Sequence, residues 1–284
     1  MALRQKLIFS VLFSALFVST IGYYGLQYFA QPKYDAFERS QLIKDGDRLS
    51  ALLGQELSQL AGVARDWGYW DDTYAFARDK NSAYIATNLT DMWLNHYSAD
   101  LLSVYSGQGG WIETVHNGVV EATELAEYPF LDKLAKNTGS GFILQGKNLW
   151  MFGVSAIKGS DGSRDSAGQV VVARQIDDLW LEDISRRFSA PIALEFLSQE
   201  SPETVVYEDE KTAFVRVALE PLNSSQISPV LSIKELRELN AAVNESVLIV
   251  IVSVFAVFLP SWFCSYFCWS EHLYAQLNRY RTTY

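Results

Sequence analysis

The amino-acid sequence predicts a mixed α+β domain that is built on an antiparallel sheet and bracketed by two membrane-spanning helices. Three observations lead to this prediction. Two uncharged apolar runs stand near the ends of the chain, an amphipathic helical pattern follows the first run, and strand patterns separated by glycine turns fill most of the middle. Because strands joined by tight turns pair with their neighbours, we expect the sheet to be antiparallel.

The two apolar runs extend from Leu7 to about Phe29 and from Val247 to about Trp269, without any Lys, Arg, Asp or Glu. About 20 apolar residues suffice to cross a bilayer as a helix. A cleaved signal peptide is the alternative for the first run. That run is longer than the ~7–15 apolar residues of such signals, and it ends in large aromatics where a small residue is expected. We therefore predict an uncleaved anchor at each end.

The flanking charges predict how these anchors are oriented. Arg4 and Lys6 precede the first run, and Arg279 and Arg281 follow the second. Short flanks rich in Lys and Arg stay in the cytoplasm. The middle of the chain then faces the periplasm or the cell exterior, and we expect a bacterial inner-membrane location. The predicted division is a cytoplasmic N-terminus (1–6), a span (7–29), an outer domain (30–246), a second span (247–269) and a cytoplasmic tail (270–284).

The predicted outer domain is strongly acidic. Residues 31–246 hold all but one of the 33 acids and all but four of the 23 bases, so their net charge is 19 − 32 = −13. Such a surface disfavours nucleic acid and anionic headgroups. It suits a cationic ligand, or it serves solubility alone. Both cysteines, Cys264 and Cys268, lie in the second apolar run, so no disulfide is expected in the outer domain.

The helical pattern after the first span runs from Pro32 to about Asp79. Within it, Leu53, Leu60 and Trp67 keep a strict spacing of seven. This stripe is either a seam between two copies of the chain, which predicts a homodimer, or one face packed on its own domain.

Alternating apolar segments bounded by turn residues predict the strands. They are expected at Leu101–Tyr105, Trp111–His116, Gly141–Leu144, Leu149–Ile157, Gln169–Arg174, Pro191–Leu197, Thr204–Tyr207, Thr212–Leu219 and Pro229–Ile233. Helices are expected over about 84–96 and 128–137, from the capping Asp177 to Phe188, and from Lys234 into the second span. The polar, glycine-bearing stretch 158–167 is expected to be a loop.

Catalytic and metal-binding patterns are weak throughout the sequence. Gly141–Lys147 imitates a phosphate-binding loop, but Asn148 stands where Ser or Thr holds magnesium, so a tight hairpin is expected. The three histidines form no metal-ligand pair at helical spacing. Adjacent acids such as Asp71 and Asp72 diverge by about 100° on a helix and do not make an acid–base pair. We predict a protein that is not an enzyme and that carries no cofactor and no metal.

The segment Asp66–Tyr74 is the densest aromatic and acidic cluster. On a helix, Trp67, Trp70 and Tyr74 share one face, and Asp71 lies beside it. An aromatic wall with a carboxylate at its rim can hold an amine or another cationic ligand. The alternative is that the aromatics fill the core and the acids face water.

The sequence Asp66-Trp-Gly-Tyr-Trp-Asp-Asp-Thr-Tyr74, followed by Tyr84-Ile85 and Asn88-Leu89, resembles the opening signature of the fourth class of CHASE domains. These are cyclase- and histidine-kinase-associated sensory extracellular domains. The stretch Gly168–Asp178 looks like the second block of that family, and the resemblance covers about residues 35–235. It implies a PAS-like sensory domain between two membrane helices.

The resemblance carries over motif positions, not a ligand. Those positions are Asp66, Trp67, Trp70, Asp71, Asp72, Tyr74, Tyr84, Asn88, Arg174 and Asp177. Our candidates for ligand binding are Trp67, Trp70, Asp71, Tyr74 and Arg174.

The leading hypothesis is a sensor that binds a small molecule or a protein outside the cell and passes a signal inward. The family implies a histidine kinase or a cyclic-di-GMP enzyme as the output. Ser270–Tyr284 is too short for such a domain, so we expect the output on a missing part of the chain or on a partner protein. The alternative is a membrane adaptor or assembly subunit that regulates a partner membrane protein.

Overall fold

A computed structural model of the 284-residue chain describes most of the predicted outer domain. The described residues are 3–107, 110–116, 119–121, 131–134, 138–198, 204–209, 211–223, 227–237 and scattered positions between 245 and 275. Cys264, Cys268 and much of the predicted span 247–269 lie outside this set, as does most of the predicted helix 128–137. The chain divides into two compact units. The first holds Met1–Gln41, Tyr207–Ala213 and Leu236–Tyr284, and the second holds Leu42–Val206 and Phe214–Glu235.

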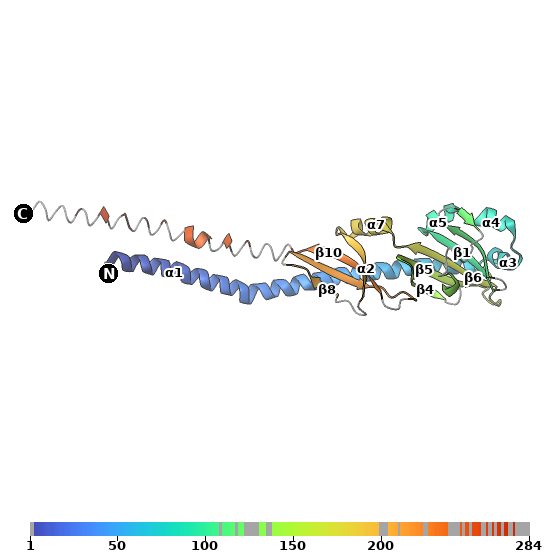
Figure 1. The fold of residues 1–284 in the computed structure, drawn as a ribbon, viewed down its shortest axis with the longest axis horizontal. Coiled ribbons are helices and arrows are strands. Elements are labelled where there is room, and N and C mark those ends of the chain that lie inside the picture. Colours follow the sequence, from blue (N-terminus) through green and yellow to red (C-terminus); the bar gives the residue numbers. More distant parts are fainter. Residues whose placement is uncertain are drawn as a thin grey trace, which may run out of the picture. The chain divides into compact units, whose positions relative to one another are not determined.

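The N-terminal part of the chain is helical over a long stretch. Helix α1 (Leu3–Gly25), a π-helical turn (Leu26–Ala30) and helix α2 (Gln31–Gly68) follow one another directly (Figure 1). Among the described residues, no helix combines the length and apolarity that a membrane crossing requires. The spans predicted over 7–29 and 247–269 stay predictions.

The second unit contains a six-stranded antiparallel sheet in the order β3-β2-β1-β6-β5-β4. The predicted hairpins β1–β2 and β4–β5 are confirmed. Gly146 has φ +61° in the tight turn of the second hairpin, where glycine adopts this angle without strain. The strands are β1 Leu101–Ser106, β2 Gly110–His116, β3 Val119–Glu121, β4 Gly139–Gln145, β5 Asn148–Ile157 and β6 Gly168–Gln175.

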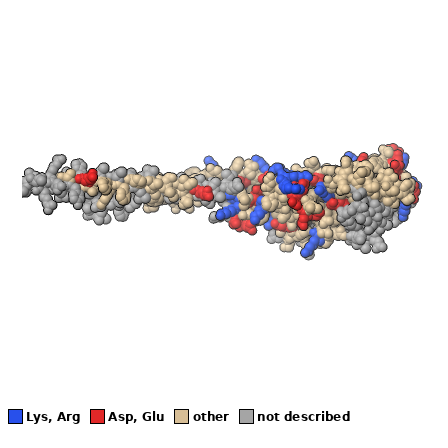
Figure 2. All heavy atoms as spheres, turned by 90° about the horizontal axis from the view of Figure 1, so that it is seen from above, with Lys and Arg blue, Asp and Glu red and all other residues tan. Residues whose placement is uncertain are grey.

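A four-stranded sheet follows in the order β7-β10-β9-β8. Its strands are β7 Ile192–Leu197, β8 Val205–Tyr207, β9 Thr212–Ala218 and β10 Ser228–Leu236. Because β10 continues to Leu236, the expectation that the chain is helical from Lys234 is wrong. The shorter helices are α3 Asp71–Asp79, α4 Ser82–Asn88, α5 Asp91–Tyr97, α6 Leu131–Leu134 and α7 Asp178–Phe188. The α+β class with a long N-terminal helix and antiparallel sheets is therefore confirmed. On the face shown in Figure 2, acidic and basic side chains are interspersed over the sheet-bearing part.

Helix α2 packs directly on strand β5 (Figure 1). A Cβ atom on Gly153 would collide with the backbone of Leu60 and Ala61, so only glycine allows this approach. Because side chains alternate across a strand, Phe152 and Val154 face away from α2 and join an apolar cluster on the other side of the sheet. Burial on both faces explains why the middle of β5 is continuously apolar.

The seven-residue stripe of α2 is buried within the second unit. Leu53 and Leu60 are each 3% exposed, and Trp67 is fully buried. Of the two interpretations of this stripe, the structure supports packing on the chain's own domain. The homodimer stays a prediction.

Candidate functional site

Helix α2 ends at Gly68 and does not continue to Asp79 as the sequence pattern predicted. A Cβ atom on Gly68 would lie 2.6 Å from the carbonyl oxygen of Ala156. The Gly68 carbonyl accepts hydrogen bonds from the backbone N–H of Lys158 (2.9 Å) and of Gly159 (3.4 Å). Strand β5 and the loop after it therefore hold the last residue of α2.

The chain turns at Tyr69 and Trp70, and α3 begins at Asp71. Because of this turn, the expectation that Trp67, Trp70 and Tyr74 share one helical face is wrong. Trp67 lies in the last turn of α2, Trp70 has extended backbone angles, and Tyr74 belongs to α3. The predicted aromatic wall is thus divided between two separate clusters.

The first cluster is aromatic and packed. The Trp67 and Trp70 rings stack with centroids 5.0 Å apart, and Trp93 stands edge-on to them at 5.9 and 6.4 Å. Tyr97 stacks on Trp93 at 6.0 Å. Trp67 is fully buried, and its Nε1 has no hydrogen-bond partner among the described residues. Trp67 therefore belongs to the core, as the alternative interpretation expected.

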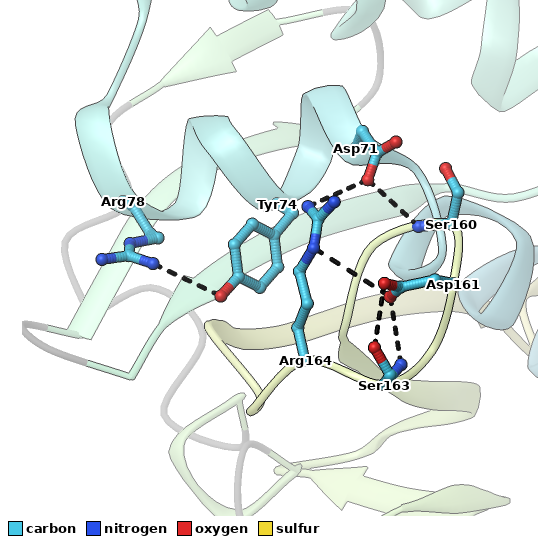
Figure 3. A network of polar contacts seen from close by, with 7 residues as sticks. All are labelled: Asp71, Tyr74, Arg78, Ser160, Asp161, Ser163 and Arg164. Carbon is cyan, nitrogen blue, oxygen red and sulfur yellow. Dashed lines mark hydrogen bonds and ion pairs between the residues drawn. The ribbon is translucent and has the colours of Figure 1, made fainter.

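The second cluster is polar and lies where loop 158–167 meets the start of α3 (Figure 3). Asp71 Oδ1 accepts a hydrogen bond from the backbone N–H of Ser160 at 3.2 Å and lies 3.0 Å from Nη1 of Arg164. The hydrogen bond from the Ser160 backbone is the main cause that lowers the pKa of Asp71 below its ordinary value, and Arg164 lowers it further. Asp71 is thus a carboxylate that anchors the loop by two contacts.

Tyr74 lies beside the same arginine. The Arg164 guanidinium carbon is 5.0 Å from the centroid of the Tyr74 ring, within the range of a cation–π contact. Nη1 of Arg78 donates a hydrogen bond to the Tyr74 hydroxyl at 3.3 Å. Figure 3 shows Arg78 at the hydroxyl end of the ring and Arg164 over its face. Asp71 and Tyr74, which the sequence singled out, therefore do lie together around a cation.

Arg174 lies elsewhere in the second unit. It extends from β6, and its Nη1 is 3.1 Å from Oε2 of Glu56 on α2. The two side chains are 21% and 16% exposed, so this ion pair is largely buried between sheet and helix. Arg174 thus holds α2 on the sheet.

Another residue of the family motif, Tyr84, also supports the scaffold. Its hydroxyl lies 2.7 Å from Thr73 Oγ1, and its ring stacks on Phe76 at 4.5 Å. Burial is the main cause that raises its pKa to about 12. Tyr84 therefore fixes α3 against α4 as a neutral side chain.

Another charged cluster lies in the first unit and was missed by the sequence analysis. Arg237, directly after β10, donates from Nε to Glu38 Oε2 at 2.9 Å and places Nη2 3.1 Å from Asp35 Oδ1. Its guanidinium carbon is 4.6 Å from the Tyr207 ring centroid, and its backbone N–H donates to Lys211 at 2.8 Å. We call Asp35, Glu38, Tyr207 and Arg237 the Arg237 cluster.

The residues that the sequence analysis missed all contact residues that are far away in the sequence. Ser160 and Arg164 stood in a segment that was expected to be only a loop, and their contact residue lies about 90 positions earlier. In the part of the chain that the structure describes, no group of His, Cys, Asp and Glu has the arrangement of a metal site.

The family whose model matches this chain is identified through residues of the second unit. A model of the CHASE4 domain family matches residues 52–195, just over half of the chain. The methanogenesis regulatory histidine kinase FilI of Methanothrix harundinacea is 25% identical over 145 residues, and the match covers 47% of this chain and 16% of that protein. The chain therefore spans a small part of the length of this curated relative.

Solved structures of sensor domains also align with the chain at low similarity. The periplasmic domain of Vibrio cholerae LuxQ aligns with a TM-score of 0.47 and 14% identity, covering 67% of this chain and 98% of that one. The ligand-binding domain of the Pseudomonas fluorescens chemoreceptor CtaA, solved with L-alanine, aligns with a TM-score of 0.38 and 12% identity, covering 71% and 97%.

Proposed function

The chain belongs to the CHASE4 domain family, and from this membership we propose that residues 30–246 are an extracytoplasmic sensor that passes a signal across a bacterial inner membrane. The family match is the observation that carries the proposal. The matched residues 52–195 include the C-terminal part of α2, the whole six-stranded sheet and α7. Sensory domains of this family lie outside the cell, so the predicted spans 7–29 and 247–269 would anchor this one, as a homodimer.

The proposed output is a histidine kinase or a cyclic-di-GMP enzyme on a longer form of this chain or on a partner. A relative of the matched region is a histidine kinase by name, which supports the first of these outputs. The sensor itself would perform no catalysis.

The contacts of α2 suggest how a signal would leave the sensor sheet. Its last residue, Gly68, accepts hydrogen bonds from the start of loop 158–167. A ligand that moves this loop would therefore change the hydrogen bonds that fix the end of α2. A ligand shifts such an equilibrium only as far as it binds one state better than the other.

A signalling chimera tests the function. Residues 1–284 are fused in frame to the kinase core of a well-behaved histidine kinase, and the phosphorylation-dependent reporter is read across a panel of metabolites. We expect at least one compound to change the reporter and to raise the melting temperature of the purified chain. A matched chimera that lacks residues 42–235 should not respond.

Protease protection provides the topological control. Protease added to intact spheroplasts should digest residues 30–246 and leave a cytoplasmic reference protein whole. Protection of these residues until lysis would contradict an extracytoplasmic sensor, whatever the chimera reports.

A further inference from the structure

The first turn of α3 presents a carboxylate and an aromatic face together. Asp71 and Tyr74 are three residues apart and therefore lie on the same side of the helix. A carboxylate beside an aromatic face attracts organic cations by a charge-assisted hydrogen bond and a cation–π contact. We call these two side chains the cation seat.

The chain itself supplies a cation to this seat. Arg164 reaches from loop 158–167 to 3.0 Å from Asp71 Oδ1 and 5.0 Å from the Tyr74 ring centroid (Figure 3). A guanidinium group in these positions makes both contacts that a dissolved organic cation would make. The structure therefore shows the cation seat in contact with a guanidinium group.

The loop lies tightly against the seat. Gly159 (φ +74°) has no room for a side chain, because a Cβ there would be 2.8 Å from Asp71 Oδ1. A Cβ on Gly162 (φ +65°) would be 2.9 Å from the Tyr69 ring. Asp161 accepts hydrogen bonds from Ser163 within the loop and lies 4.0 Å from Nε of Arg164. These contacts direct Arg164 toward α3.

Arg164 is nevertheless held loosely. The side chains of Arg164 and Asp71 are 42% and 54% exposed, compared with 21% and 16% for Arg174 and Glu56. Ion pairs between exposed side chains contribute little net free energy, because water solvates both charges when they separate. Displacement of Arg164 by a dissolved cation of the same chemistry therefore costs little free energy.

We propose that the cation seat is a binding site for a small organic cation with a guanidinium or primary ammonium group, which Arg164 fills in the unliganded protein. This inference rests on the sensor function proposed above and specifies its ligand class. The surplus of acids in residues 31–246, a net charge of 19 − 32 = −13, raises the local concentration of such cations. Displacement of Arg164 removes one of the two contacts by which Asp71 holds the loop, and the loop is bonded to Gly68 at the end of α2.

Titration of the full chain in detergent micelles tests the site. The probes are n-butylguanidinium and n-butylammonium chloride, with sodium chloride at equal ionic strength as the blank. We expect Arg164→Ala to bind both probes about threefold or more tightly than the natural chain, because removal of the internal competitor raises the fraction of open seats. Asp71→Asn should weaken binding about tenfold through loss of the charge-assisted contact.

Arg186→Ala is the matched control. Arg186 also forms an exposed ion pair in the second unit, with Asp183 at 3.4 Å, but it lies on α7. Its loss should leave probe affinity unchanged. Equal affinity of Arg164→Ala and the natural chain, or undiminished binding by Asp71→Asn, would overturn the cation seat. If Asp71→Asn unfolds, the comparison of Arg164→Ala with Arg186→Ala decides alone.

Failure here is distinguishable from failure of the sensor function. A chimera that responds to an uncharged or anionic metabolite, with an unchanged response after Arg164→Ala, would reject the cation seat and keep the sensor.

Discussion

Arg164 and Arg237 make the same kinds of contact in very different surroundings. Each guanidinium pairs with carboxylates and lies over a tyrosine ring. Arg164 is 42% exposed and belongs to a surface loop, whereas Arg237 is 12% exposed and its partner Glu38 is 10% exposed. Burial makes the difference, since separating a buried pair leaves charges that water does not reach. We therefore expect the Arg164–Asp71 pair to open more easily than the Arg237–Glu38 pair.

The two clusters also join different parts of the chain. The Arg237 cluster joins the start of α2 to the residue that follows β10, within the first unit. These are the segments nearest in sequence to the two predicted spans. The Arg164 cluster joins a loop to α3 within the second unit. The buried Arg237 cluster is suited to transmitting a signal between these segments. The exposed Arg164 cluster is suited to binding the ligand that starts the signal.

The largest effect is expected for Arg237→Ala. It leaves the Glu38 carboxylate buried without its ion-pair partner, and loss of one partner of a buried pair costs about 3–5 kcal/mol of stability. Denaturant unfolding of the full chain in micelles, followed by circular dichroism, measures this. A double-mutant cycle with Glu38→Gln isolates the pair. A loss below about 1 kcal/mol would show that burial does not distinguish the two clusters.

The contact of α2 with β5 is another buried contact. Gly153→Ala places a methyl group against the backbone of Leu60 and Ala61, so we expect a loss of about 1–3 kcal/mol from overpacking. Gly54→Ala is the matched control, because Gly54 lies in α2 with nothing near its Cβ position. That change should instead stabilise the chain by about 0.5–1 kcal/mol. Equal effects at both positions would contradict the close approach of helix and sheet.

Arg174→Gln provides an intermediate case. The Arg174–Glu56 pair is less exposed than the Arg164 pair and more exposed than the Arg237–Glu38 pair. We expect a loss of about 1 kcal/mol, between the buried and the exposed cases. A loss as large as that of Arg237→Ala would mean that exposure does not rank these contacts.

The smallest effect is expected for Asp71, through the pH dependence of the stability of the folded chain. The pKa of Asp71 is lowered in the folded chain, chiefly by the hydrogen bond from the Ser160 backbone, then by the Ser160 side chain, and to a smaller extent by Arg164. The contribution to stability is therefore fully present above the ordinary aspartate value and is lost only as pH falls through the lower folded value. NMR titration of the Asp71 carboxyl should show a pKa that rises only part of the way in Arg164→Ala. A complete return to the ordinary value would mean that Ser160 does not hold the carboxylate.

Local patterns in the sequence predicted the elements that depend on local contacts. The long amphipathic helix, the two hairpins and the capped α7 follow from periodicity, turn glycines and Asp177. The end of α2 was missed, because it depends on the close approach of Gly68 to the backbone of Ala156, which is far away in the sequence. Asp71 and Tyr74 were singled out as candidates through their residue types and spacing, and the structure brings them together around Arg164. Arg164 and Arg237 were not, since nothing in their own segments encodes the distant carboxylates they meet.

Hydrogen exchange of the full chain, with and without n-butylguanidinium, compares the two clusters most directly. We expect the probe to speed exchange across loop 158–167 several-fold, because Arg164 leaves Asp71, and to leave the backbone around Glu38 unchanged. Unaltered exchange in the loop, or equal acceleration at both places, would contradict an Arg164–Asp71 pair that opens more easily than the Arg237–Glu38 pair.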